Sequence, residues 1–103
     1  MTAVTAYPIS IYDERRLAMT LVDAETLPVQ GASGRFLPEG IILLYGKPSN
    51  QSWQLIRAEV YGPKLKTGGV LSAIRGSHCW YPPDTKPEWL QSIIDIYLPG
   101  TGE

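Results

Sequence analysis

Apolar and polar residues alternate most clearly in the middle of the chain, between Trp53 and Gly62. The alternating positions are Ile56, Arg57, Ala58, Glu59, Val60 and Tyr61. A period of two residues predicts a β-strand with one side buried and the other in contact with water. The apolar run Ile41–Tyr45 comes before this strand, and Val70–Gly76 comes after it. Because the connecting segments are rich in Gly, Pro and Asn, Ile41–Arg75 is expected to form a three-stranded antiparallel meander.

Near the C-terminus, large apolar residues recur every three or four positions instead of every two. They are Trp89, Leu90, Ile93, Ile94 and Tyr97. This spacing places them on one stripe of a helix. Thr85 and Glu88 have the spacing of a capping box, in which both side chains bond N–H groups at the helix start. These patterns predict a helix over Lys86–Tyr97 that packs against the sheet.

The N-terminal part of the chain has shorter and more ambiguous patterns. Leu17–Val22 fits a strand, because alternate residues share a face, but a helix that begins near Asp13 is also compatible with it. From their composition, the charged cluster Asp13–Arg16 is expected to form a turn and Gly31–Gly40 a loop. Pro63 has no N–H group to donate and is expected to end the second strand of the meander.

We therefore expect one α+β domain over residues 1–103, a small antiparallel sheet, rolled or sandwich-like, with the C-terminal helix packed on it. A length of 103 residues is enough for one hydrophobic core. Hydrophobic residues make up 44% and charged residues 18%, which excludes an intrinsically disordered chain. The longest apolar run, Gly40–Gly46, is too short to cross a bilayer, and the first ten residues do not fit a signal peptide. We expect no membrane contact and a cytoplasmic location.

The segment Arg75–Asp84, with the sequence RGSHCWYPPD, contains the chain's single histidine and single cysteine. A thiolate nucleophile needs a base within hydrogen-bond reach. Neighbouring residues of a strand point to opposite faces, so His78 is not placed to activate Cys79. One His and one Cys also fall short of the four ligands of a structural zinc site. We expect no catalytic residue, no metal and no cofactor.

The aromatic residues of the same segment are the best candidates for a binding surface. Pro82 and Pro83 favour an extended backbone before them, so Trp80 and Tyr81 should point to opposite sides. One ring can then enter the core, while the other is available to a partner. Tyr, Trp and Arg are frequent in interface hot spots, and we expect a protein partner to contact Arg75, Trp80 and Tyr81.

Two other functions are weaker alternatives. Basic and aromatic residues lie together on the predicted meander, namely Arg57, Lys64, Lys66 and Arg75 with Trp53 and Tyr61. Such a surface could stack the bases of single-stranded nucleic acid. The net charge of −1 and the acidic Glu59 close to Arg57 argue against this partner. A small hydrolase that uses His78 is the third alternative.

The order W…RAEVYGP…TGG, followed by PEWLQSIIDIYLP, resembles small proteins of actinobacteria and their phages. Those proteins have a strand that ends in Gly-Pro and finish with a Pro-x-Trp-Leu helix followed by proline. The resemblance covers Trp53–Pro99. It implies the same sheet-and-helix architecture and a phage or actinobacterial origin, and it implies no particular activity.

The strand Ile41–Tyr45 also bears on the oligomeric state. It contains no charge or proline that would prevent it from pairing with another chain if it lay at the edge of the sheet. Either the N-terminal strands or a second copy of the chain must cover it, and we expect a homodimer. The sequence as a whole favours a non-enzymatic interaction module that binds another protein or itself.

Overall fold

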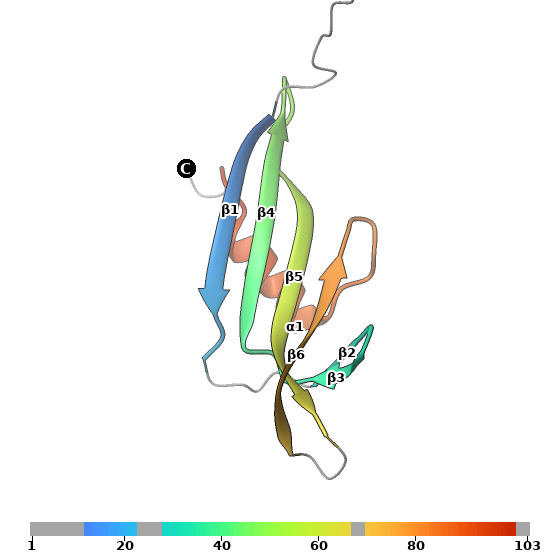
Figure 1. Ribbon diagram of the computed structural model, residues 1–103. Coiled ribbons are helices and arrows are strands. Elements are labelled where there is room, and N and C mark those ends of the chain that lie inside the picture. Colours follow the sequence, from blue (N-terminus) through green and yellow to red (C-terminus); the bar gives the residue numbers. More distant parts are fainter. Residues whose placement is uncertain (1–11, 23–27, 67–69, 101–103) are drawn as a thin grey trace, which may run out of the picture.

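The computed structural model describes residues 12–22, 28–66 and 70–100. Within these ranges the chain forms six strands and one helix (Figure 1). The strands are β1 Tyr12–Thr20, β2 Val29–Gly31, β3 Gly34–Phe36, β4 Gly40–Pro48, β5 Gln54–Leu65 and β6 Leu71–Trp80, and the helix is α1 Glu88–Tyr97. The expected α+β class, an antiparallel sheet with one C-terminal helix, is confirmed.

The strands are arranged around β5, which is the longest of them. One edge of β5 pairs with β4 and, further along, with β3, while the other edge pairs with β6. β1 pairs with β4 along its whole length, and β2 pairs with β3. All of these pairings are antiparallel. The predicted meander over Ile41–Arg75 corresponds to β4, β5 and β6, which are consecutive in the chain and adjacent in the sheet.

Strand β1 resolves the ambiguity of the N-terminal part. Leu17–Val22 is a strand except for its last two residues, and Asp13–Arg16, which we expected to form a turn, belongs to the same strand. Its charged side chains are tolerated because β1 lies outside β4, where they are exposed, while Leu17 and Met19 pack on the core. Because β1 covers β4, Ile41–Tyr45 is not the open edge that suggested a homodimer.

The expected loop over Gly31–Gly40 is wrong, because most of this segment forms the β2–β3 hairpin and the start of β4. Gly34 allows the turn, since its backbone has a φ of +129°, which residues other than glycine rarely adopt. The hairpin places Phe36 in the core, where it is fully buried. The backbone between β3 and β4 stays hydrogen-bonded to the edge of β5.

Helix α1 begins at Glu88, two residues later than expected, and ends at Tyr97 as predicted. The predicted capping box is wrong: no side chain caps the helix, and Glu88 is its first residue instead of its third. The reason is local geometry, since Pro87 is extended, with ψ at 146°, and occupies the capping position. Thr85 therefore lies too far before the first turn to cap it.

The buried face of α1 is narrower than the predicted stripe. Leu90 and Ile94 are buried against the sheet, whereas Tyr97 is 47% exposed. Tyr45 of β4 is fully buried, and its hydroxyl donates a hydrogen bond of 2.7 Å to the carbonyl of Ile94. That carbonyl lies in the last turn of α1, so the hydrogen bond from Tyr45 fixes the end of the helix on the sheet. Burial, with a smaller contribution from Asp95, raises the pKa of Tyr45 to about 12.

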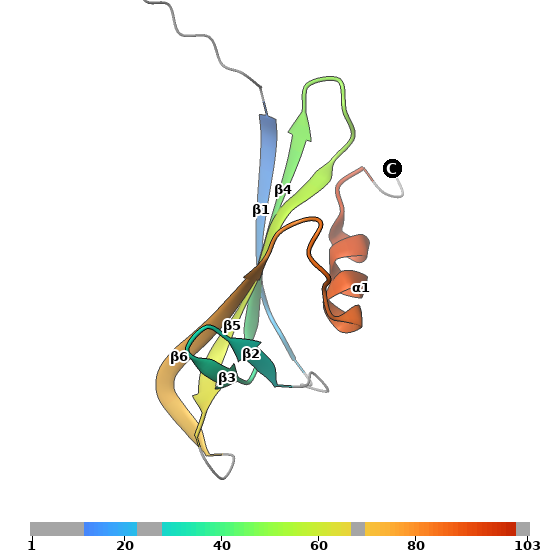
Figure 2. The same ribbon diagram turned by 90° about the vertical axis from the view of Figure 1, so that its right-hand side faces the viewer.

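The ribbon formed by β5 and β6 curves beside the β2–β3 hairpin, whereas α1 stands beside the other part of the sheet (Figure 2). In the curved part, Gly62 of β5 pairs with Gly76 of β6. A Cβ atom at Gly62 would overlap the carbonyl oxygen of Leu37, and one at Gly76 would lie 3.1 Å from the side chain of Phe36. The two glycines therefore allow the neighbouring backbone and Phe36 to approach β5 and β6 closely.

Pro63 lies inside β5 and does not end it, contrary to expectation. It pairs with Arg75 of β6, and its carbonyl accepts a hydrogen bond of 2.9 Å from the N–H group of Leu37. The ladder between β5 and β6 shifts its register between Pro63 and Leu65. The proline is thus accommodated next to an irregularity of the ladder, where a missing donor does not interrupt regular pairing.

Candidate binding groove

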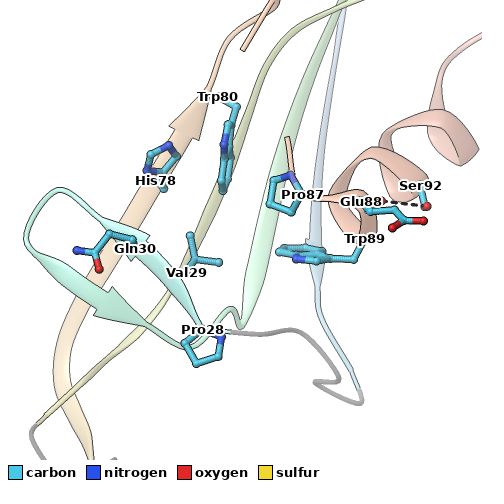
Figure 3. A pocket seen from close by; sticks show the side chains of 9 residues that line it. All are labelled: Pro28, Val29, Gln30, His78, Trp80, Pro87, Glu88, Trp89 and Ser92. Carbon is cyan, nitrogen blue, oxygen red and sulfur yellow. Dashed lines mark hydrogen bonds between the residues drawn. The ribbon is translucent and has the colours of Figure 1, made fainter. Parts of the chain in front are cut away.

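A groove of about 850 Å³ opens between the start of β2, the end of β6 and the first turns of α1 (Figure 3). Its lining residues are Pro28, Val29, Gln30, His78, Trp80, Pro87, Glu88, Trp89 and Ser92. The fold brings together three segments that are far apart in the sequence. The volume lies within the range of pockets that bind small ligands, roughly 300–1,000 Å³.

His78 and Trp80 lie side by side on the β6 side of the groove (Figure 3). They are alternate residues of one strand, so their side chains share a face. Their ring centroids are 4.3 Å apart and their planes make an angle of 47°. Trp80 is only 7% exposed and belongs to the hydrophobic core as well as to the groove. Cys79, between them, points to the other face of β6, so the imidazole does not lie beside the thiol.

Two prolines and a second tryptophan form the walls that face β6. Pro28 comes directly before β2, Pro87 directly before α1, and Trp89 lies in the first turn of α1. Trp89 is partly buried and packs against the core. Because proline has no N–H group, the walls offer no main-chain donor at residues 28 and 87. They present flat apolar surfaces instead.

The polar groups of the groove are few. Gln30, Glu88 and Ser92 are exposed, and Glu88 carries the formal charge of the lining. The hydroxyl of Ser92 donates a hydrogen bond of 3.1 Å to the main-chain carbonyl of Glu88, not to its carboxylate. Within the described residues, no hydrogen bond or ion pair uses the Glu88 carboxylate or the indole N–H group of Trp80 or Trp89.

The structure does not bring the predicted binding residues Arg75, Trp80 and Tyr81 into one site. Trp80 lies in the groove, whereas Arg75 points to the opposite face of β6. There its guanidinium contacts the carboxylate of Glu39 at 2.8 Å, and this hydrogen bond raises the pKa of Arg75. Tyr81 is 52% exposed and does not line the groove. The expectation that one ring of the pair is buried and the other exposed is confirmed.

The segment RGSHCWYPPD is half strand and half turn. Arg75–Trp80 forms the end of β6, and a turn follows over Tyr81–Asp84. The N–H group of Asp84 donates to the carbonyl of Tyr81 at 2.6 Å, and a carboxylate oxygen of Asp84 accepts the N–H group of Tyr81 at 3.1 Å. These two bonds direct the chain from β6 toward α1, so this turn helps to set the width of the groove.

The remaining reactive groups are scattered. In the part of the chain that the structure describes, no three His, Cys, Asp or Glu side chains lie together as a metal site would require. Cys79 is a free, partly buried cysteine. The groove itself holds one imidazole, one carboxylate and one hydroxyl, from His78, Glu88 and Ser92. Most of its lining residues are aromatic or proline, which suits the binding of a ligand more than catalysis.

Sequence reasoning found Trp80 but missed the walls of the groove. The helical pattern predicts Trp89 in the core and Glu88 in a helix cap, and no pattern gives Pro28 a role. No pattern in the sequence connects residues 28–30 with residues 78–80, because their contact depends on a hairpin that was expected to be a loop. The available signal was the occurrence of tryptophan beside proline in two neighbouring segments, WYPP and PEW.

The chain matches no protein-family model, no curated protein and no solved structure. Among the described residues, no helix is long and apolar enough to cross a membrane. Within the described residues, the groove is the main structural indication of function.

Proposed function

We propose that the protein is a non-enzymatic interaction module that binds a segment of another protein in the groove between β2, β6 and α1. The main supporting observation is that Trp80 and Trp89, from separate elements, line the same open groove. Tryptophan combines a large apolar surface with one N–H donor, and it is enriched among residues that dominate binding energy. Arg75, on the opposite face of β6, and Tyr81, outside the lining, would belong to a separate contact surface.

The three elements around the groove are each anchored in the core. The β2–β3 hairpin is held by Phe36, and α1 is held by Leu90 and by the hydrogen bond from Tyr45. Trp80 of β6 is itself buried. A site on anchored elements loses little conformational freedom when a ligand docks, which favours affinity.

The two alternatives from the sequence have less support. A nucleic-acid groove combines aromatic stacking with Lys and Arg that contact phosphates, but this lining has neither basic residue and includes Glu88. A hydrolase would need a nucleophile beside His78. Cys79 points to the other face of β6, and the hydroxyl of Ser92 is bonded to the helix backbone.

The setting is proposed from the resemblance alone: an accessory protein of a phage or an actinobacterium, acting in the cytoplasm. Self-association through a homodimer belongs to the same proposal. Because β1 covers Ile41–Tyr45, that strand does not offer an open edge to a second copy. We therefore prefer a different protein as the partner.

Selection of a random peptide library against the immobilised chain tests the proposal. Peptides enriched on the parent chain should lose binding to Ser92→Arg, which introduces a long charged side chain at the groove. Gln91→Arg is the matched control, because Gln91 is an exposed neighbour on the same helix and does not line the groove. The expected result is loss of binding with the first variant and retention with the second.

Equal binding of the enriched peptides to both variants would place the site elsewhere. Arg75→Ala and Tyr81→Ala would then show whether the exposed residues predicted from the sequence form it. A library that yields no binder, combined with salt-dependent binding of a labelled single-stranded oligonucleotide, would overturn the proposal in favour of nucleic acid.

A further inference from the structure

The geometry points to one class of ligand for this groove: an extended, proline-rich segment of a partner protein, with an arginine or lysine placed next to Glu88. This inference rests on the proposed function and adds the chemistry of the bound segment. Proline-rich segments adopt the polyproline II helix, which has no internal hydrogen bonds and is already restricted before binding. They therefore lose little entropy when they dock in an aromatic groove.

The walls favour this mode of binding over the addition of a strand. Strand addition requires a continuous row of main-chain N–H and C=O groups on the receiving edge. Pro28 and Pro87 remove the N–H group at the groove on both sides. Stacking of proline rings requires flat aromatic surfaces instead, and the partly exposed rings of His78 and Trp89 supply them beside the buried Trp80.

The hydrogen-bonding groups of the groove also fit such a ligand. The carbonyl groups of a polyproline II helix point outward and have no partner within the segment. Trp80 is 7% exposed and lines the groove, and no acceptor among the described residues takes its indole N–H group. A tryptophan N–H group that faces the groove can donate a hydrogen bond to such a carbonyl.

The charge of the groove determines which residue flanks the prolines. Glu88 is exposed at the first position of α1, and the lining has no lysine or arginine to neutralise it. A guanidinium group can pair with a carboxylate through two hydrogen bonds, whereas an acidic ligand residue would be repelled. The groove therefore selects a basic residue at the end of the ligand nearest to α1.

Calorimetric titration with three synthetic peptides of about ten residues tests the inference. The first carries repeated Pro-Pro-Leu units with one terminal arginine, the second replaces that arginine by glutamate, and the third replaces every proline by alanine. The arginine peptide should bind saturably, and the glutamate peptide about fivefold more weakly, which is the upper end of the range for an exposed ion pair. The alanine peptide should show no saturable binding.

Variants of the chain sharpen this comparison. Glu88→Lys should reverse the charge preference, so that the glutamate peptide binds more tightly than the arginine peptide. Glu14→Lys makes the same charge change at an exposed residue of β1, outside the groove, and should leave the order of affinities unchanged.

The outcomes separate the ligand class from the proposed function. If library peptides bind in a manner that depends on Ser92 but contain no proline, the ligand class is wrong and the proposed function stands. If Glu88→Lys leaves the charge preference unchanged, the assigned role of Glu88 is wrong. If the chain dimerises and Ser92→Arg abolishes the dimer, a second copy occupies the groove and the inference is overturned.

Discussion

The sheet has two parts, one beside α1 and one beside the β2–β3 hairpin, and their packing differs. Beside α1, large apolar side chains fill the space between helix and sheet, among them Ile41, Leu43 and Leu90, which are fully buried. Beside the β2–β3 hairpin, Gly62 and other glycines let backbone segments come close, and Phe36 fills the space that is left. The packing beside α1 therefore depends on large apolar side chains, whereas the packing beside the hairpin depends on glycines, which have no side chain.

This difference bears on function because the groove lies where the two parts meet. One wall belongs to α1 and the other to β2, with Trp80 between them (Figure 3). The shape of the groove therefore depends on both kinds of packing. Substitutions can disturb one kind at a time, which allows their contributions to be measured separately.

The largest effect is expected from truncating a core side chain in either part. Phe36→Ala should lower the free energy of unfolding by about 3–5 kcal/mol, and Leu90→Ala by about 2–5 kcal/mol, because each leaves a cavity at a fully buried position. Both parts share β5, so each variant should still unfold in a single transition. Urea unfolding followed by tryptophan fluorescence and by circular dichroism checks this.

Ile74→Ala is the control for these substitutions, since Ile74 is 64% exposed and should change the stability by less than about 0.5 kcal/mol. If the two probes reported separate transitions in Phe36→Ala or Leu90→Ala, the two parts would unfold independently. The account of a single fold built around β5 would then be wrong.

The next largest effect should come from adding one methyl group in the glycine-rich part. Gly62→Ala should cost about 3 kcal/mol, because the new Cβ would overlap the main-chain carbonyl of Leu37. Gly40→Ala is the comparison: there the obstacle is the end of the Tyr61 side chain, which is partly exposed and can rotate away. We expect Gly40→Ala to cost about 1 kcal/mol. Thermal unfolding of both variants measures the two losses. If Gly40→Ala and Gly62→Ala lowered the melting temperature equally, Gly62 would not be required for the close approach of the Leu37 backbone.

Tyr45→Phe probes the part beside α1 with a smaller change. It should lower the free energy of unfolding by about 2 kcal/mol, because the carbonyl of Ile94 loses its donor at a buried site. The fold should persist, since the phenyl ring still fills the same space. Denaturation at neutral pH measures the loss, and an unchanged midpoint would mean that the hydroxyl does not fix the helix.

Tyr45 should also make the stability of the fold depend on pH. Since burial and Asp95 raise the pKa of Tyr45 to about 12, the folded chain keeps a proton that the unfolded chain releases above about pH 10. Stability should therefore fall as pH rises from about 10 to about 12, by about 1.4 kcal/mol at pH 11. In Tyr45→Phe this component is absent, so the stability difference from the parent should narrow between pH 9 and pH 11. A constant difference over that interval would contradict the assignment.

The smallest effect is expected at the ion pair between Arg75 and Glu39. Both side chains are about half exposed, at 55% and 49%, and exposed pairs add little to stability. Arg75→Ala should leave the melting temperature within experimental error. A marked loss of stability would show that the ion pair contributes more to the fold than the exposure of its two side chains suggests.

The contrast between the two parts also explains how much of the fold could be predicted from the sequence. The strand around Ala58 and Val60 and the helix around Leu90 and Ile94 follow from the period of their apolar residues, and both predictions are confirmed. The hairpin was missed because Gly34 and its neighbours have the composition of a loop. Only a contact with β5, distant in the sequence, turns that segment into strands.

The candidate site was predictable only in part for the same reason. Trp80 could be singled out from its neighbours, and the opposite orientation of Tyr81 follows from strand geometry. The approach of Pro28 and Trp89 to Trp80 depends on how far β5 and β6 curve and on where α1 docks. Neither quantity leaves a local pattern in the sequence, so the walls of the groove emerge only from the structure.

The most direct test of the groove as the binding site uses the three tryptophans as internal reporters. Trp80 and Trp89 line the groove, whereas Trp53 lies outside it, with the guanidinium of Arg15 5.4 Å from its ring centre. Their indole N–H signals, assigned by Trp→Phe substitutions, are followed in ¹H–¹⁵N spectra during titration with a library-selected peptide. The account predicts that the signals of Trp80 and Trp89 shift saturably while that of Trp53 does not move. A shift of Trp53 alone, or no shift of any indole signal at saturating peptide, would contradict it.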